Sequence, residues 1–143
     1  MKRAPLASVA RLLLAAAVLG LASASVCAGQ SARNPRVLCH YTYGGEEKRL
    51  WVDPVASPYG VEPVAVGSYF QFKVVFQTAP RSSAGIRVYV SADREPVPVP
   101  IHQANFPYPE RMQSSGYGFT GQHWVYEPVR DGEMQYWCEM KKP

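Results

Sequence analysis

The chain is short of charged residues and of long apolar runs, and each shortage argues against a class of protein. Charged residues make up 18% of its 143 positions, and setting aside Lys2, Arg3 and Arg11 leaves 12 basic against 11 acidic side chains. A nucleic-acid-binding surface needs a standing excess of Lys and Arg, so we expect no nucleic-acid partner. The apolar run at 12–21 rises only about 15 Å as a helix, half the thickness of a bilayer core, and we expect no transmembrane segment.

Residues 1–28 have the features of a cleaved secretory signal peptide. Lys2 and Arg3 precede the apolar run, and small residues follow it as far as Ala28. Cleavage after Ala28 discards Cys27 and leaves an even number of cysteines. A lipid anchor on Cys27 is the alternative, but the residues before this cysteine do not fit the usual lipoprotein pattern. We therefore expect a periplasmic or secreted protein, and the style of the leader indicates a bacterial envelope.

Beyond the signal peptide we expect a flexible polar segment at 29–36 and one domain at 37–143. The two cysteines that are left, Cys39 and Cys138, stand near the opposite ends of this domain. In an oxidising compartment such a pair predicts a structural disulfide, whereas the cysteines of redox-active pairs usually lie close together in sequence. Closing a loop of about 100 residues contributes about 4–5 kcal/mol in the loop-entropy model.

Apolar side chains recur with a period of two after residue 36, which is the pattern of β-strands. The clearest strand is 68–77, in which the even-numbered positions from 70 to 76 are apolar. Further strands are predicted at 37–42, 49–52, 86–91, 97–102, 123–126 and 134–140. Pro98 and Pro100 cannot donate ladder hydrogen bonds, so 97–102 is predicted to be an edge strand. No amphipathic helix is indicated.

Seven or eight short antiparallel strands favour an all-β sandwich. Cys39 is followed twelve residues later by Trp51, and Tyr136 stands two residues before Cys138. This arrangement of cysteines, tryptophan and tyrosine resembles the immunoglobulin fold, and the resemblance implies an immunoglobulin-like β-sandwich but nothing about immune recognition. Because Cys138 lies on the last predicted strand, we expect the disulfide to link the first strand to the last.

Three histidines follow the leader, and a metal site is one alternative reading of them. Imidazole and thioether groups together suit copper, and sheet pairing could bring His102 and His123 together with Met112. The sequence has no His-x-His and no methionine-rich run, however, and the alternation with apolar neighbours places His40 and His102 on solvent faces. We therefore expect no metal and no cofactor.

Enzymatic activity is not indicated by the sequence. No serine stands in a strained elbow motif, and Glu46 and Glu47 are adjacent, so their side chains point apart. The glycine-rich stretch 116–121 precedes a strand-like run, whereas a phosphate-binding loop precedes a helix. We expect a non-catalytic protein, with a small secreted hydrolase as the second alternative.

Residues 106–126 concentrate aromatic, glycine and proline residues and predict a long loop over the sandwich. Aromatic side chains in such a loop provide rigid contact area for a protein, a peptide or a glycan. The alternative is that the rings fold back over an open end of the sandwich. The sequence thus predicts a binding or accessory protein of the envelope, with a contact surface formed by Tyr108, Tyr117, Phe119 and Trp124.

Overall fold

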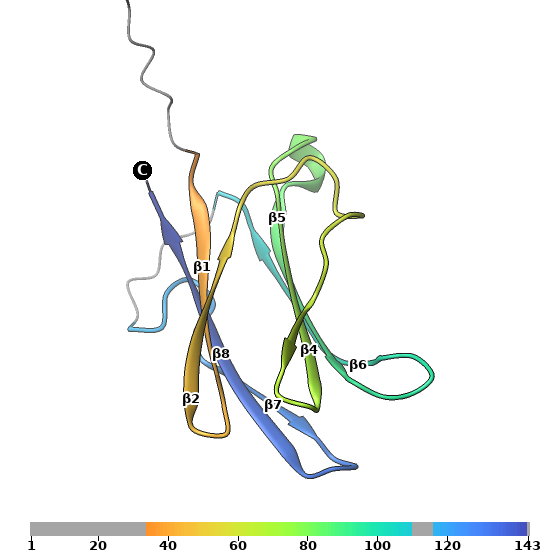
Figure 1. Ribbon diagram of the computed structural model, residues 1–143. Coiled ribbons are helices and arrows are strands. Elements are labelled where there is room, and N and C mark those ends of the chain that lie inside the picture. The colour runs from red at the N-terminus through yellow and green to blue at the C-terminus, as the bar shows by residue number, and fades with distance from the viewer. Residues whose placement is uncertain (1–33, 110–115, 143) are drawn as a thin grey trace, which may run out of the picture. The chain divides into compact units, whose positions relative to one another are not determined.

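The computed structural model describes residues 34–109 and 116–142, which form two four-stranded antiparallel sheets (Figure 1). Sheet A has the strand order β2-β1-β8-β7, and sheet B has the order β3-β4-β5-β6. The elements are β1 (Arg36–Tyr43), β2 (Glu46–Val52), β3 (Val64–Val66), β4 (Phe70–Gln77), the short 3-10 turn η1 (Arg81–Ser83), β5 (Gly85–Ala92), β6 (Val99–Pro107), β7 (His123–Glu127) and β8 (Gly132–Lys141).

The expected all-β class, with two antiparallel sheets, is confirmed. No helix within the described ranges has the length and apolar character that crossing a membrane requires. Three sequence-based expectations lie outside the described residues. They are the signal peptide, the alternative lipid anchor on Cys27 and the candidate metal ligand Met112.

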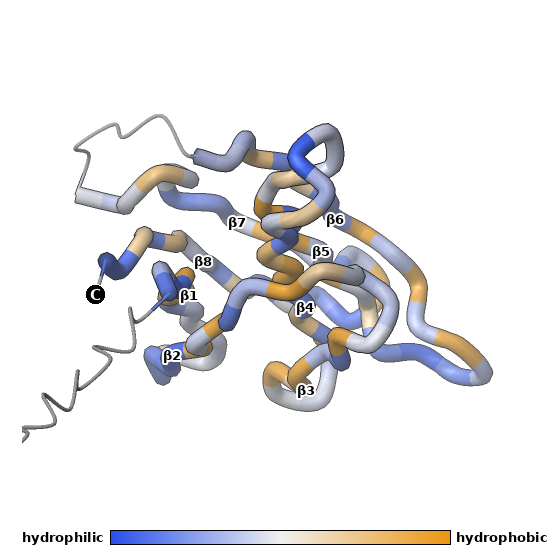
Figure 2. Tube along the Cα trace, turned by 90° about the horizontal axis from the view of Figure 1, so that it is seen from above, coloured by the Kyte–Doolittle hydropathy of each residue, from blue (hydrophilic) through white to orange (hydrophobic). Residues whose placement is uncertain are grey.

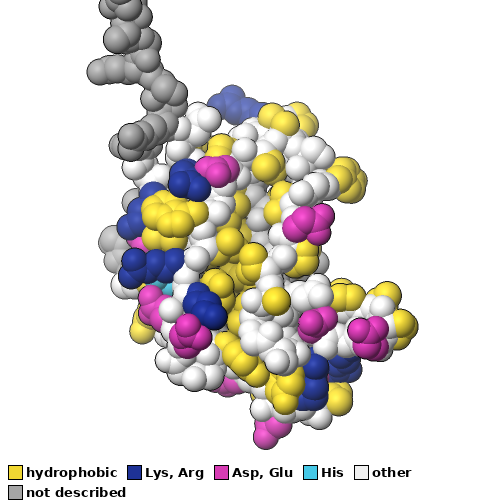
Figure 3. Space-filling model, in the orientation of Figure 1, with side chains coloured by type: hydrophobic (Ala, Val, Ile, Leu, Met, Phe, Trp, Pro, Cys, Tyr) yellow, Lys and Arg dark blue, Asp and Glu magenta, His cyan; other side chains and the backbone are white. Residues whose placement is uncertain are grey.

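The inward faces of the two sheets meet in an aromatic and aliphatic core. Phe72 of β4 lies against Tyr41 of β1 and Tyr136 of β8, with ring centroids 5.5 and 5.4 Å away. Burying a phenylalanine side chain is worth roughly 1.5–3 kcal/mol. Figure 2 looks onto the sandwich from above and shows hydrophobic segments of β4 and β5 near its centre, and Figure 3 shows hydrophobic side chains along the seam between the sheets.

The disulfide between Cys39 and Cys138 joins β1 to β8, and these cysteines face each other directly in the strand register. The expected link between the first and the last strand is therefore confirmed. The immunoglobulin-like arrangement is not the one observed. In that fold the disulfide joins two sheets and a buried tryptophan packs against it, but here both cysteines belong to sheet A and Trp51 is 47% exposed.

The order of the strands also differs from that of the immunoglobulin fold. Sheet B is a simple meander, and sheet A consists of two hairpins that are joined where β1 pairs with β8. In the β1–β2 hairpin, Gly44 and Gly45 form the turn with φ of 60° and 82°, a conformation that glycine adopts without strain. The strand after this turn begins at Glu46, three residues earlier than expected, because the charged residues 46–48 pair with β1.

Strand β6 lies at an edge of sheet B, as its prolines predict, but it contains an irregularity that the sequence did not reveal. Val90 pairs with His102, whereas the next residue, Ser91, pairs with Pro100. The extra residue between these two positions of β6 shifts the alternation by one. His102 therefore points toward the core instead of toward solvent, and Phe106 belongs to the strand instead of the expected loop.

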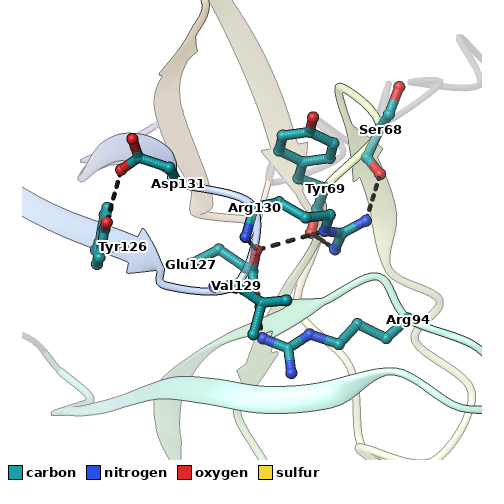
Figure 4. Close-up of polar contacts among 8 residues, drawn as sticks. All are labelled: Ser68, Tyr69, Arg94, Tyr126, Glu127, Val129, Arg130 and Asp131. Carbon is teal, nitrogen blue, oxygen red and sulfur yellow. Dashed lines mark hydrogen bonds and ion pairs between the residues drawn. The ribbon is translucent and has the colours of Figure 1, made fainter.

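A buried carboxylate ties the two sheets together at one end of the sandwich (Figure 4). The Glu127 side chain, which is fully buried, accepts a hydrogen bond from the Arg94 guanidinium and another from the backbone N–H of Arg130. Arg130 in turn donates to the backbone carbonyls of Ser68 and Tyr69, at 3.3 and 3.2 Å. The β7–β8 turn of sheet A is thereby fixed to the turn that precedes β4 in sheet B.

This carboxylate predicts a loss of stability in acid. Burial by itself raises the pKa of Glu127, but hydrogen bonds from Arg94 and from the β7–β8 turn outweigh it and lower the pKa from 4.5 to about 2. A carboxyl group with a lower pKa in the folded state stabilises the fold above its unfolded pKa, and the contribution disappears as the pH falls toward the folded pKa. We therefore expect Glu127→Gln to be less stable than the wild type at neutral pH, and the difference to shrink from about pH 5 downwards.

Urea unfolding at pH 7, 4 and 3 measures this difference. Glu62→Gln, at an exposed position in the segment between β2 and β3, is the matched control and should follow the wild type throughout. A destabilisation by Glu127→Gln that is equally large at pH 7 and pH 3 would contradict the assignment.

Candidate binding surface

All three tryptophans of the protein lie on the outer face of sheet A, turned away from the core. Trp51 is in β2, Trp124 in β7 and Trp137 in β8. Neighbouring residues of a strand point to opposite faces, and Trp137 directly precedes Cys138, which is buried in the core. Trp137 pairs with His40, which directly follows the equally buried Cys39.

Two tyrosines extend this surface. Tyr126 follows two residues after Trp124 on β7, and Tyr117, from the segment before β7, meets Trp137 edge-on with ring centroids 6.1 Å apart. Trp51, Trp124, Tyr117 and Tyr126 are between 46% and 58% exposed. We call these four residues together with Trp137 the aromatic face.

His40 holds Trp137 in place. The two rings are stacked with centroids 3.9 Å apart and an interplanar angle of 2°. The two ring nitrogens of His40 lie 3.3 Å from a carboxylate oxygen of Glu47 and 3.0 Å from one of Glu139. Burial opposes ionisation of Glu139, but hydrogen bonds from Lys141 and His40 outweigh this and lower the pKa of Glu139. His40 lies on the outer face, as expected, but it is buried there because Trp137 covers it.

Other rings of the aromatic face are also held by polar neighbours. The Arg36 guanidinium lies over the Trp51 ring, 4.9 Å from its centroid. The Tyr126 hydroxyl donates a hydrogen bond of 2.6 Å to Asp131, and this hydrogen bond raises the pKa of Tyr126. Rings that are held in this way lose less conformational entropy when a partner binds.

The structure divides the four residues expected to form one contact loop into two groups. Tyr108 and Phe119 pack on the core, with Tyr108 edge-on to Phe76 at 4.8 Å and Phe119 edge-on to Phe106 at 5.6 Å. Tyr117 and Trp124 are exposed on the aromatic face. Tyr108 and Phe119 thus fold back onto the sandwich, whereas Tyr117 and Trp124 are accessible to a partner. A binding role for Tyr117 and Trp124 stays a prediction.

Trp51 and Trp137 were not among the expected contact residues. In immunoglobulin domains the tryptophan at the corresponding place is buried in the core, whereas Trp51 is exposed. The period-two pattern contained the missing signal, because a residue next to the core cysteine Cys138 has to point to the outer face.

The histidine pair of the alternative metal site is close together in the structure. The rings of His102 and His123 have centroids 5.5 Å apart, and His102 Nε2 lies 2.7 Å from the Tyr136 hydroxyl oxygen. Burial, followed by the charge of His123, lowers the pKa of His102, and burial raises the pKa of Tyr136. Among the described residues, no group of three or more His, Cys, Asp or Glu side chains is arranged to hold a metal ion.

The glycine-rich stretch before β7 is fixed to the strand that carries the disulfide. The backbone N–H of Phe119 donates to the Cys138 carbonyl at 3.0 Å, and the Cys138 N–H donates to the Thr120 hydroxyl at 2.8 Å. Gly118 has φ of 62°, and a Cβ at this position would lie 2.1 Å from the Cys138 carbonyl oxygen. Only glycine allows this approach, which places Tyr117 beside Trp137.

The chain matches no family model, no curated protein and no solved structure. Its function is therefore argued from its own residues.

The close approach at Gly118 generates a prediction. Gly118→Ala introduces a backbone clash together with a positive φ, and we expect it to destabilise the protein by more than about 1 kcal/mol. Gly116→Ala is the matched control two residues away, because a Cβ there meets nothing within 4 Å. Thermal unfolding followed by circular dichroism compares the two variants, and equal melting temperatures would contradict the anchoring of this segment to β8.

Proposed function

We propose that this protein is an exported, non-catalytic binding or accessory protein of the bacterial envelope, and that the aromatic face contacts another protein. The observation that carries this proposal is the position of all three tryptophans on one outer sheet face. Tryptophan, tyrosine and arginine are the residues that most often dominate binding free energy at protein interfaces.

The charges around the aromatic face favour a protein partner over a glycan or a peptide. Basic and acidic side chains alternate at its margin, with Arg36 paired to Asp53 at 2.6 Å and Lys141 paired to Glu139 at 2.8 Å. Arg49 adds an exposed cation on β2. An aromatic centre with a margin of both charges is the layout of protein–protein interfaces. Binding to a glycan or a short peptide is a separate outcome of the test below.

The proposed location, the periplasm or the exterior of the cell, rests on two features. Residues 1–28 have the pattern of a signal peptide. The disulfide between Cys39 and Cys138 suits an oxidising compartment.

The contacts of the histidines support a non-catalytic function over the hydrolase alternative. A hydrolytic triad requires a histidine hydrogen-bonded to the nucleophile. Within residues 34–109 and 116–142, His40 contacts two carboxylates, His102 contacts Tyr136, His123 contacts the Thr120 carbonyl, and none of the three is hydrogen-bonded to a serine.

The proposal predicts that exposed rings on β2 and β7 dominate binding. We expect Trp51→Ala and Trp124→Ala each to weaken capture of one envelope protein at least tenfold, about 1.4 kcal/mol or more, without lowering the melting temperature. Val97→Ala, an exposed apolar position in the β5–β6 loop of sheet B, should capture the partner like the wild type. Phe119→Ala should lower the melting temperature instead, because this ring packs on the core.

Immobilised protein and envelope extract, with the bound proteins quantified by mass spectrometry, provide the measurement. A partner captured equally by the wild type and both tryptophan variants would refute the aromatic face as the contact surface. Retention on insoluble envelope polysaccharide that both tryptophan variants lose would replace the protein partner with a glycan.

A copper-binding protein is the second candidate, and the proximity of His102 and His123 is the observation that favours it. We expect titration of metal-free protein with Cu(I) and Cu(II) to show no submicromolar binding. Submicromolar binding that His102→Ala and His123→Ala abolish, but that the control His40→Ala keeps, would establish the metal site. Met112→Leu then tests the candidate third ligand.

A further inference from the structure

The outer face of sheet B contains a groove of about 690 Å³ that the proposed function does not use. Its floor consists of outward-pointing side chains of β4 and β5, and one wall is formed by Pro58 and Tyr59 from the segment between β2 and β3. The residues that line it are Pro58, Tyr59, Lys73, Val75, Gln77, Ser83, Arg87, Tyr89 and Ser91. The volume is in the range of small-molecule sites in proteins.

The segment that leads to this wall is hydrogen-bonded to the end of β4. The backbone N–H of Val55 donates to the Phe76 carbonyl at 2.8 Å, and the N–H of Thr78 donates to the Val55 carbonyl at 3.2 Å. The Gln77 side chain also donates to the Ala56 carbonyl at 3.2 Å. These bonds fix residues 55 and 56 beside the groove, and Tyr59 stands exposed at its rim.

Two cations and no carboxylate line the groove. Lys73 is opposite Tyr89 in the strand register, and Arg87 is two residues before Tyr89 on the same strand, so the cations are diagonal neighbours. The outer face of sheet B thus carries two positive charges at the groove with no carboxylate among the lining residues. In the described part of the chain, the Lys73 side chain forms neither a hydrogen bond nor an ion pair.

Arg87 is positioned by neutral groups alone. Its guanidinium donates to the side-chain oxygen of Gln77 at 2.8 Å and to the Ser83 carbonyl at 3.1 Å. Gln77 is itself fixed, because its side-chain nitrogen donates to the Ala79 carbonyl at 2.8 Å. A guanidinium has five N–H donors, so donors are left over for a ligand while the charge is not neutralised.

The remaining residues of the groove indicate which kind of molecule bears the anionic group. Tyr59 and Tyr89 present aromatic rings with hydroxyl groups, and Ser83 and Ser91 add two further hydroxyls. Val75 is buried at the floor although it belongs to the outer face of the sheet. A ligand that matches this set has a flat apolar side, several hydroxyl groups and at least one negative charge.

We propose that the groove binds an acidic saccharide, with the carboxylate of a sugar ring between Lys73 and Arg87 and the ring against Tyr59. The sheet B groove is on a different sheet from the aromatic face and makes a second, independent binding site. A carboxylate there accepts charge-assisted hydrogen bonds, which are stronger than bonds between neutral groups.

Titration of the exported protein with digalacturonate, followed by calorimetry, tests the proposal. We expect saturable binding that Lys73→Gln and Arg87→Gln each weaken about tenfold or more, since a hydrogen bond to a charged group contributes about 1.5–3 kcal/mol. Lys73→Gln removes no contact within the protein and should keep the wild-type melting temperature. Tyr59→Ala should also weaken binding, and Arg49→Gln, which removes an exposed cation on sheet A, should not.

Galactose, which lacks the carboxylate, and inorganic phosphate, which lacks the sugar, are titrated at the same concentrations. We expect neither to bind as tightly as digalacturonate. Absence of saturable digalacturonate binding, or binding that Lys73→Gln leaves unchanged, would overturn it. Phosphate binding as tight as that of digalacturonate would overturn the saccharide assignment, because a simple anion site needs no sugar. Trp124→Ala is expected to bind digalacturonate normally, so failure of the aromatic face and failure of the groove are distinguishable.

Discussion

The pairing of β1 with β8 is the contact on which the rest of the sandwich depends. Sheet A would otherwise be two separate hairpins, and isolated hairpins are at best marginally stable in water. The disulfide between Cys39 and Cys138 lies within this pairing and limits the entropy that the unfolded chain can gain. The aromatic face depends on the same contact, because Trp51 belongs to one hairpin while Trp124 and Trp137 belong to the other.

The alternation of side chains along each strand lets one small domain carry a core and two different outer faces. Cys138 points inward and its neighbour Trp137 outward, and the same holds for Phe76 and the groove residue Gln77. Sheet A presents aromatic rings at its outer face, and sheet B presents two cations and several hydroxyl groups. A side chain on either outer face can therefore be substituted without changing the core or the other outer face.

Strong local patterns predicted most of the strands, and features that depend on distant partners escaped prediction. The alternation over 68–77 and the prolines of β6 were sufficient to identify a core strand and an edge strand. The inward direction of His102 depends on a bulge that β6 acquires opposite β5, and three-residue β3 is too short for a periodic signal. Of the four expected contact residues, only Tyr117 and Trp124 are exposed, since the segment that contains them is fixed to β8 through Gly118. No local pattern in the sequence indicates what either outer face would bind.

The separation of the two paired cysteines along the chain, 99 positions, also sets an order of events during biogenesis. The first strand, β1, can pair with β2 as soon as both are synthesised, but its other neighbour, β8, is the last strand, so sheet A is completed only when the whole domain has been made. The disulfide can therefore close only after the two hairpins of sheet A have met, and it then holds the beginning and the end of the domain together.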